Sequence, residues 1–332
     1  MTKILAIESS CDETSVAVID NGRVISNLIA NQTIHSEYGG VVPELASRSH
    51  QENIIPVTQA ALHKAQIELR DINGIAVTTG PGLMGALLVG VCFAKSLAYS
   101  LKTPLIEVNH MQAHILAHFA EAPYPDFPFL CLTVSGGHTQ IVLVRDHLDM
   151  EIIGQTLDDA VGEAFDKGGK IFGLGYPAGP VIDSLAKKGQ ANITLPEPQV
   201  PGLDFSFSGI KTAVLYHVQA QKAIDPAYLD KNIHDLCASL QSKLVDILMK
   251  KLVKASDIYG IKEVAIAGGV SANSALRHQI ISVGKELGWK TYIPKFEYCT
   301  DNAAMIGIAA HYKFLKNQVS PLDITPHPRL PF

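Results

Sequence analysis

His110 and His114 lie four residues apart, and of all the spacings in this sequence theirs most directly predicts a chemical function. On an α-helix, residues i and i+4 lie on one face about 6 Å apart along the axis. That separation lets both imidazoles bind one metal ion. His118 continues the same face but lies about 12 Å from His110, too far for that ion. Because Met111 follows His110, the H-E-x-x-H pattern of metalloproteases is absent, and ordinary surface or capping histidines stay open as the alternative.

A third metal ligand would have to come from another part of the chain. Asp301, in the segment Cys299-Thr-Asp-Asn302, is the best candidate. It stands at the predicted start of the last helix, where a carboxylate is also a common N-cap. The sequence therefore allows Asp301 to be either a ligand or a helix cap.

Two glycine-rich segments could bind an anion or a nucleotide. Ser135-Gly136-Gly137-His138-Thr139 separates two predicted strands and offers backbone N–H groups that no side chain blocks. Ala267–Asn273 has the order strand, glycine turn and helix start, which lets a nucleotide lie against bare backbone. A tight hairpin and a capped helix start explain the two equally well. The loop Gly80–Gly85 lacks the lysine of a P-loop and the G-x-G-x-x-G pattern, which disfavours P-loop and Rossmann folds.

Charged residues form a further group of candidates. Asp12 and Glu13 are expected at the tip of the first hairpin, where a carboxylate could act as a base or hold a cation, or could simply be solvated. Asp166 and Asp183 are expected on helices, where contacts to a ribose and surface salt bridges both fit. A solvated helix face is the more common role for any single lysine, but possible phosphate contacts are Lys167, Lys170, Lys187, Lys188, Lys211, Lys250, Lys251 and Lys254.

Alternating strand and helix patterns supply the elements that would position these residues. The expected strands are Lys3–Glu8, Thr14–Asp20, Arg23–Ala30, Gly74–Thr79, Leu105–Val108, Phe129–Val134, Gln140–Arg145, Glu151–Leu157, Glu263–Ala267 and Lys290–Ile293. The main expected helices are Gly85–Ser100, His110–Phe119, Ala160–Phe172, Gly179–Lys188, Ser208–Gln221, Pro226–Ser256, Ala272–Leu287 and Asn302–Lys316. A helix that begins at Pro43 should be kinked or split by Pro56.

The order of these elements predicts an α/β fold made of two related lobes. Two three-strand meanders, beginning at Lys3 and Phe129, each open a series of this kind. We therefore expect lobes over residues 1–125 and 126–332 that face one cleft, with the last helix packing back on the first lobe. The proline-rich stretch 189–207 is expected to be a surface excursion, and Ser320–Phe332 an extended tail.

Composition and charge exclude several classes of protein. The chain has 332 residues, a formal net charge of −5 and only 18% charged residues, which excludes disorder and coiled coil. It has no global basic field, so a nucleic acid would need a local patch. Five scattered cysteines predict neither a disulfide framework nor a cysteine zinc site. The apolar stretch Pro81–Ala94 is too short to span a bilayer and no signal peptide is evident, so a soluble cytosolic protein is expected.

Seven colinear motifs carry a family resemblance that extends from residue 3 to about residue 317. They are Ile7–Ser15, Tyr38–Arg48, Asn109–His114, Val134–Gln140, Gly162–Lys167, Pro201–Gly209 and Cys299–Ala304. In these motifs the chain resembles the bacterial tRNA N6-adenosine threonylcarbamoyltransferases. The resemblance implies two actin-like, ribonuclease-H-like lobes, as in Hsp70 and sugar kinases.

The resemblance also implies the residues of the site. It implies one divalent metal ion, iron or zinc, held by His110, His114 and Asp301. It implies binding of an adenylate, or of ATP or ADP, by Thr133, Val134, Ser135, Gly136, Gly137, Asp166, Gly179, Asp183 and Asn273. Asp12 or Glu13 would then be the general base.

The implied reaction moves the threonylcarbamoyl group from threonylcarbamoyl-adenylate to N6 of adenosine 37, in tRNAs that read codons beginning with A, and releases AMP. The adenosine would be recognised in the single-stranded anticodon loop. Implied partners are a catalytically silent paralogous subunit and a small P-loop ATPase, with no membrane involved.

Three other functions are compatible with the fold or with the history of the family. A kinase or ATPase of the same fold would bind Mg²⁺ through carboxylates, so the paired histidines disfavour it. A metal-dependent glycoprotein endopeptidase is disfavoured by the missing glutamate beside His110. A non-catalytic assembly subunit is disfavoured because the metal and nucleotide motifs are intact.

Overall fold

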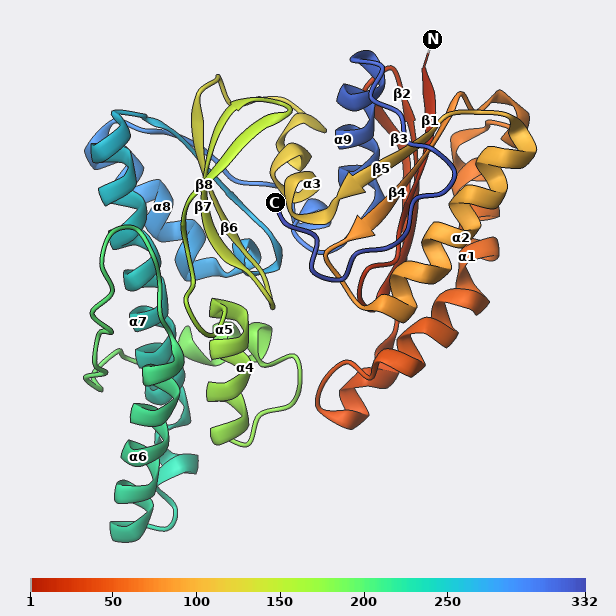
Figure 1. Cartoon of the computed structure of the whole chain (residues 1–332). Helices are drawn as coiled ribbons and strands as arrows, with labels where there is room; N and C mark the ends of the chain where they lie inside the picture. The colour runs from red at the N-terminus through yellow and green to blue at the C-terminus, as the bar shows by residue number, and fades with distance from the viewer. Residues whose placement is uncertain (1) are drawn as a thin grey trace. The chain divides into compact units, whose positions relative to one another are not determined.

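The computed structural model describes residues 2–332, apart from the side chains of residues 33, 36 and 37 (Figure 1). It contains two compact units. Unit 1 comprises Met1–Tyr124, Asp146–Met150 and Pro294–Phe332, and unit 2 comprises Pro125–Arg145 and Glu151–Ile293. The chain thus returns to unit 1 after unit 2 is complete. The expected domain limits, 1–125 and 126–332, stay a prediction.

Unit 1 is built on a five-stranded mixed sheet in the order β3-β2-β1-β4-β5. Its strands are β1 (Lys3–Glu8), β2 (Glu13–Asp20), β3 (Arg23–Asn31), β4 (Gly74–Gly80) and β5 (Leu105–Asn109). The first three strands form an antiparallel meander, and β4 and β5 run parallel to β1. The carboxyl ends of β1, β4 and β5 therefore meet at one edge of the sheet, where sites commonly form in such folds.

Unit 2 repeats this topology in a sheet of order β8-β7-β6-β9-β10. Its strands are β6 (Phe129–Val134), β7 (Thr139–Asp146), β8 (Asp149–Gln155), β9 (Glu263–Ala267) and β10 (Lys290–Tyr292). As in unit 1, the second strand is antiparallel to the first and the last two are parallel to it. The predicted α/β fold with two related halves is confirmed.

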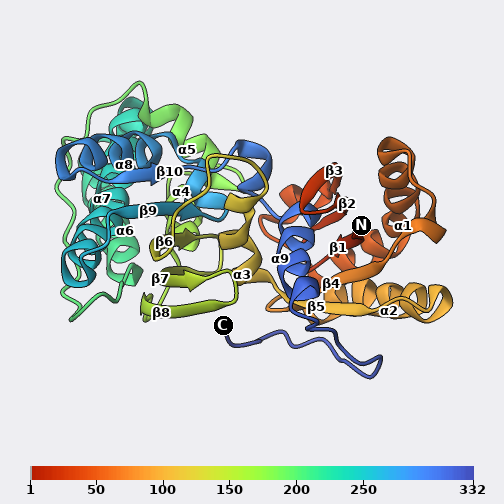
Figure 2. The ribbon, with the colours of Figure 1, turned by 90° about the horizontal axis from the view of Figure 1, so that it is seen from above.

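Helices flank both sheets (Figure 2). Unit 1 holds α1 (Pro43–Ala65), α2 (Met84–Leu101), α3 (His110–Leu116) and α9 (Ala303–Leu315), and unit 2 holds α4 (Val161–Ile171), α5 (Ala178–Ala186), α6 (Ser208–Ile224), α7 (Tyr228–Tyr259) and α8 (Ser274–Leu287). Short 3₁₀ turns lie at Thr33–Tyr38, Leu69–Asp71, Ala117–Phe119, Gly269–Ala272 and Phe296–Tyr298. Within unit 1, α9 packs against β1 and β2, although it comes last in the chain.

Of the two outcomes expected at Pro56, a kink or a split, the split is wrong, because α1 continues through this residue; a kink there stays a prediction. A proline removes one helical hydrogen bond to the carbonyl four residues earlier. Here both Pro56 and Glu52 are exposed, so water can bind the carbonyl that is left. Burial of Ile54, Thr58 and Ala61 on the opposite side keeps the helix packed.

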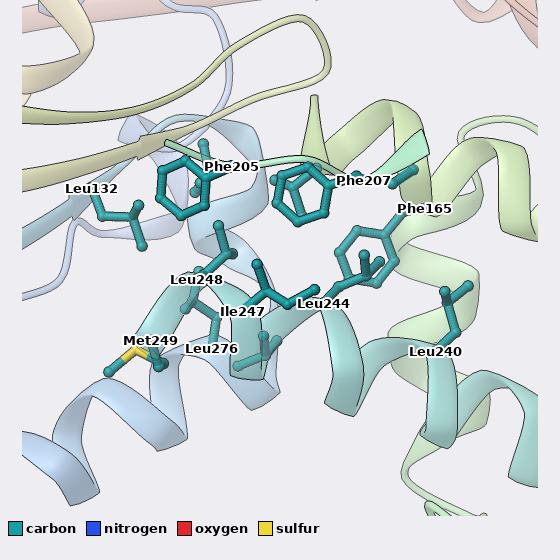
Figure 3. Packing of buried hydrophobic residues seen from close by; sticks show 14 of the residues in the cluster. Leu132, Phe165, Phe205, Phe207, Leu240, Leu244, Ile247, Leu248, Met249 and Leu276 are labelled. Carbon is teal, nitrogen blue, oxygen red and sulfur yellow. The ribbon is translucent and has the colours of Figure 1, made fainter. Parts of the chain in front are cut away.

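The stretch 189–207 is not a purely surface excursion, which corrects the sequence expectation. It has no helix or strand, but Phe205 and Phe207 are fully buried. Figure 3 shows both rings packed over Leu244 and Leu248 of α7. Prolines disfavour helices and strands, which accounts for the irregular backbone of the stretch. The two aromatic side chains nevertheless hold its end in the core of unit 2.

The apolar run that starts at Pro81 continues as α2, past Lys95 to Leu101. By length and composition alone, α2 could cross a membrane. In unit 1 it packs against β4 and α1, and its buried side is made of Ala86, Leu87, Gly90, Val91, Ala94 and Ala98. Such a partly buried, apolar helix is also typical of a protein core.

Candidate functional site

His110 and His114 lie on α3, which begins directly after β5. The Asn109 side chain caps α3 by accepting hydrogen bonds from the backbone N–H groups of Met111 (2.9 Å) and Gln112 (3.2 Å). Both imidazoles are buried, and their rings meet edge to face with centroids 4.7 Å apart. One helix face therefore presents both histidines together, at the edge where β1, β4 and β5 end.

Asp301 brings a carboxylate to the histidine pair. Its Oδ1 lies 3.3 Å from His110 Nε2 and 3.2 Å from His114 Nε2. One ligand atom from each residue can be chosen so that all three lie within 4.8 Å of one another. Asp301 does not cap α9, because that role belongs to Asn302, whose Oδ1 accepts a hydrogen bond of 3.0 Å from the N–H of Met305. The cap interpretation of Asp301 is therefore wrong.

These three side chains fit a divalent metal ion. Both ring nitrogens of His114 are buried; Asp301 lies beside Nε2, and Nδ1 has no hydrogen-bond partner among the described residues 2–332, an arrangement that is costly without a ligand. Burial lowers the pKa of His114, which keeps the imidazole neutral, as a metal ligand must be. Two imidazole nitrogens and a carboxylate suit zinc and iron alike and leave a coordination position for a substrate.

Glu8, which the motif spacing does not predict as a site residue, lies behind His110. Its Oε2 is 3.0 Å from His110 Nδ1 and accepts a 2.7 Å hydrogen bond from Thr78, while Oε1 accepts one of 2.5 Å from the N–H of Ser10. A carboxylate in this position orients a metal-binding imidazole and raises its basicity. The sequence signal was a charged residue at the end of an otherwise apolar strand.

The pKa values of Glu8, His110 and Asp301 depend on one another. Burial would lower the pKa of His110, but Asp301 and Glu8 outweigh it and raise that pKa well above its ordinary value. Burial would raise the pKa of Glu8, but His110 holds it below its ordinary value. Burial likewise opposes ionisation of Asp301, whose pKa His110 and His114 nevertheless depress. The cluster therefore favours a positive charge at its centre, which a metal cation would supply.

Asp12 and Glu13 lie in the β1–β2 turn, and Glu13 is the first residue of β2. Burial, together with the charges of Asp301 and Asp12, raises the pKa of Glu13 to about 10. The raised pKa favours the protonated carboxyl group of Glu13 when no metal offsets the charge of Asp301. The choice between Asp12 and Glu13 as the general base stays a prediction.

The β1–β2 turn is held from two sides. On one side, His50 of α1 pairs its Nδ1 with Thr14 Oγ1 (2.8 Å) and its Nε2 with the carbonyl oxygen of Cys11 (3.0 Å). On the other side, a Cβ on Gly82 would lie only 2.5 Å from the carbonyl oxygen of Ser10. Gly82, in the loop after β4, therefore allows this turn to pack closely, because it has no side chain.

The β6–β7 turn of unit 2, Ser135–Thr139, presents bare backbone. Within the described part of the chain, no heavy atom lies within 4 Å of the Cβ position of Gly136 or Gly137. The start of α4 packs close by, since a Cβ on Gly162 would lie 2.5 Å from the carbonyl oxygen of Ser135. Thr133 and Val134 are buried in β6, which pairs with β7 and β9. As neighbours in a strand their side chains point to opposite faces of the sheet, and that of Val134 belongs to the core cluster of unit 2.

Of the other residues expected to bind a nucleotide, Gly179 and Asn273 lie at helix starts, whereas Asp166 and Asp183 lie within α4 and α5 and contact the starts of the helices that follow. Asp166 accepts a 2.8 Å hydrogen bond from the N–H of Ala178 at the start of α5. Asp183 accepts hydrogen bonds from the N–H (3.2 Å) and hydroxyl (2.6 Å) of Ser274 at the start of α8, which Asn273 caps. Both aspartates therefore also have a structural role as helix caps.

A cavity of about 650 Å³ opens in unit 2 between α5, α7 and α8. Gln241, Ser274 and His278 are among its lining residues. Asn273 donates a 2.7 Å hydrogen bond to Gln241 and so borders this lining. The volume is within the range of small-molecule sites, which is about 300–1,000 Å³.

Several lysines predicted as phosphate contacts have partners within unit 2. Lys167 pairs with Asp159 (2.6 Å) and Glu163 (2.9 Å), and Lys187 pairs with Asp183 (3.1 Å). Lys250 pairs with Glu197, while Lys251 and Lys254 donate to the carbonyl oxygen of Gly202 at 3.0 and 3.2 Å. The lysine group on α7 therefore holds the 189–207 stretch, a role that its sequence spacing did not predict.

Comparison with known proteins identifies the family. A family model described as tRNA N6-adenosine threonylcarbamoyltransferase matches residues 23–308. The chain is 57% identical to the tRNA N6-adenosine threonylcarbamoyltransferase of Christiangramia forsetii, covering 99% of this chain and 98% of that protein. It is 60% identical to the enzyme of the same name from Riemerella anatipestifer, covering 97% and 96%.

Two solved structures share the fold at low sequence identity. The full-length HypF structure in its phosphate- and nucleotide-bound form is 14% identical with a TM-score of 0.60, covering 95% of this chain and 46% of that one. The activator of 2-hydroxyisocaproyl-CoA dehydratase from Clostridium difficile is 13% identical with a TM-score of 0.53, covering 96% and 97%. At such identities these structures support the fold alone.

Proposed function

Because the chain belongs to the tRNA N6-adenosine threonylcarbamoyltransferase family, we propose that His110, His114 and Asp301 hold the metal ion with which it modifies tRNA. The acceptor is then the exocyclic amine of adenosine 37, in tRNAs that read codons beginning with A. The donor is threonylcarbamoyl-adenylate, a mixed anhydride that releases AMP. The metal is iron or zinc, because the His₂Asp donor set suits both.

The chemical difficulty of this reaction lies in the acceptor. The lone pair of an adenine amine is delocalised into the ring, so the amine must be positioned and the carbonyl it attacks must be polarised. When bound, the metal would supply that polarisation as a Lewis acid. Glu8 keeps the His110 ring oriented for this role.

A proton must leave the amine as the new carbon–nitrogen bond forms and the bond to the AMP oxygen breaks. Asp12 is the proposed acceptor of that proton, because it lies in the turn next to Glu13 and close enough to influence its pKa. Glu13, whose pKa is raised to about 10, is instead suited to donate a hydrogen bond. Proton transfer of this kind contributes roughly a hundredfold to ten-thousandfold in rate.

The donor is proposed to bind in unit 2. The bare backbone at Gly136 and Gly137 can approach a phosphate closely. The cavity beside Gln241 and Ser274 can take the adenosine part. Asp166, Gly179, Asp183 and Asn273 stay proposed contacts, with Thr133, Val134 and Ser135 as the strand end that supports the turn.

We also propose a cytoplasmic enzyme that works with partners, namely a silent paralogous subunit and a small P-loop ATPase. The support is electrostatic: the net charge is −5, and the α7 lysines are engaged within unit 2. A partner would then supply part of the surface that binds the tRNA phosphates. Measuring tRNA binding with and without a candidate partner tests this, and tight, salt-sensitive binding by the chain alone would contradict it.

The observation that supports the metal site most strongly is the convergence of two buried imidazoles and a carboxylate, with Asp301 Oδ1 3.3 Å from His110 Nε2 and 3.2 Å from His114 Nε2. The test is His110→Ala, with bound metal measured by mass spectrometry and transfer measured from threonylcarbamoyl-adenylate to unmodified tRNA. Both should fall to background. His118→Gln is the matched control, because it changes a nearby buried histidine that is not a proposed ligand. Full transfer by the metal-free variant would refute the proposal.

A further inference from the structure

The 320–331 segment follows α9 without helix or strand, yet its backbone is bonded to unit 1 along its length. The N–H of Ser320 donates to the carbonyl oxygen of Leu105 (2.7 Å), and the Ser320 hydroxyl accepts from the N–H of Glu107 (3.1 Å). These contacts lie on β5, the edge strand of the sheet. Figure 2 shows the segment in dark blue, passing β5 and α2. It thus covers an open sheet edge of unit 1.

Farther along, the segment crosses the carboxyl end of β4. The N–H of His327 donates to the carbonyl oxygen of Thr79 (2.7 Å), and the carbonyl oxygen of Pro328 accepts from the N–H of Gly82 (3.1 Å). A Cβ on Gly80 would lie only 2.0 Å from the carbonyl oxygen of His327. Glycine at position 80 is therefore required for the segment to lie this close.

The segment finally reaches the start of the helix that carries both histidines. The carbonyl oxygen of Pro331 accepts a 2.9 Å hydrogen bond from Asn109 Nδ2. The other side-chain atom of Asn109, Oδ1, accepts from the N–H groups of Met111 and Gln112. The Asn109 amide is thus bonded on both sides, to the segment and to the first turn of α3, and the next residue is His110.

We propose that the 320–331 segment is a positioning element of the metal centre, acting through Asn109. This inference rests on the proposed function, because it assumes that His110, His114 and Asp301 bind the metal. α3 has only seven residues, and so short a helix depends strongly on its cap. By fixing the Asn109 amide, the segment fixes the direction in which α3 leaves β5, and with it the two imidazoles.

The contacts of the segment favour this role over a general contribution to the core. Of its apolar side chains, Ile324 packs against the core cluster around β1 and β4, whereas Leu322 is 43% exposed. The segment is held mainly by hydrogen bonds to backbone atoms at strand ends. Its loss should therefore affect the geometry at the start of α3 more than the folding of unit 1.

The test compares the full chain with a chain that ends at Pro328, which keeps the contact to Gly82 and loses the one to Asn109. Zn²⁺ affinity is measured by competition with a chelating dye, and Co²⁺ is used to record the visible spectrum of the site. We expect Zn²⁺ affinity to fall by roughly tenfold to a hundredfold, as when a partner of a metal ligand is removed. The Co²⁺ spectrum should change, while the melting temperature of the metal-free protein stays close to that of the full chain.

Two further variants test whether the segment acts through Asn109. Asn109→Ser retains a capping oxygen but removes the amide group that donates to Pro331. In the shortened chain this substitution should cause little additional loss of Zn²⁺ affinity, because both changes remove the same hydrogen bond. Lys95→Met is the matched control, since it removes another hydrogen bond to the segment, from Lys95 Nζ to the carbonyl oxygen of Ile324 (3.0 Å). It should leave Zn²⁺ affinity unchanged.

The outcomes separate this inference from the function it rests on. Equal Zn²⁺ affinity in the full and shortened chains would overturn the positioning role while leaving the metal site intact. If the full chain and His114→Ala bind Zn²⁺ equally weakly, the proposed metal site itself fails, and the positioning role fails with it. Loss of affinity in Lys95→Met as large as in the shortened chain would also overturn the role of Asn109.

Discussion

The two first-hairpin turns of the molecule occupy equivalent places in sheets of the same strand order, yet they are built for opposite charges. The β1–β2 turn of unit 1 is packed from both sides and carries Asp12 and Glu13 beside the histidine cluster. The β6–β7 turn of unit 2 carries Gly136 and Gly137 with open space around them. Carboxylates and imidazoles favour a cation, whereas bare N–H groups favour an anion. Two sheets of the same strand order thus carry first turns of different composition, acidic in unit 1 and glycine-rich in unit 2.

The largest effect is expected when the negative charge of Asp301 is removed from the unit 1 cluster. Asp301→Asn should abolish bound metal and reduce transfer by at least about a thousandfold, because several kcal/mol of charge stabilisation would be lost. The fold should persist, since Asn302 and not Asp301 caps α9. Metal analysis and a transfer assay check this. Asp257→Asn, at an exposed aspartate of α7, serves as the control, and retained metal in Asp301→Asn would contradict the assignment.

A smaller effect is expected from the residue behind the histidines. Glu8→Gln should weaken metal binding by roughly tenfold to a hundredfold, because it removes the carboxylate that orients His110 and leaves the three ligands in place. Metal affinity is measured by dye competition. Glu68→Gln, at a carboxylate whose side chain is 67% exposed, should have no effect. Equal affinities in Glu8→Gln and the unchanged protein would show that Glu8 has only a structural role.

The β6–β7 turn of unit 2 can be altered without changing the proposed metal ligands. Gly136→Val should weaken binding of an adenylate analogue by roughly tenfold, because the side chain would stand where a phosphate approaches. Metal affinity should not change. Calorimetric titration measures both. Gly209→Val, at another glycine with open space around its Cβ position, should leave both unchanged, and undiminished binding in Gly136→Val would place the donor elsewhere.

The smallest effect is expected from the α7 lysines. Replacing Lys250, Lys251 and Lys254 together by Met should change tRNA affinity by less than about twofold and leave its salt dependence unaltered, because these lysines bond within unit 2. Cleavage of the 189–207 stretch by a protease should instead become faster. A marked loss of tRNA affinity would show that the lysines also contact phosphates.

The repeat of strands and helices was predictable because strand patterns are local: Phe129–Val134 and Glu263–Ala267 were predicted with the bounds the structure has. The fit of His110 and His114 on one helix face also follows from local spacing. Glu8 was not predicted as a site residue, because its role depends on β4 and α3, which lie far along the chain. Whether Pro56 splits α1 was not predictable for a related reason, since only tertiary packing shows that its side of α1 is exposed.

The position of Asp301 has a consequence for how the protein is made. Unit 1 begins with the first strand but is completed by Pro294–Phe332, so its metal ligands are separated by nearly the whole of unit 2 in the chain. Domains generally form in the order of synthesis, and a ribosome that has made His110 and His114 must still translate all of unit 2 before Asp301 emerges. With the proposed ligands His110, His114 and Asp301, a nascent chain cannot assemble the full set before unit 2 has been translated, and the proposal thus implies that the metal is acquired late.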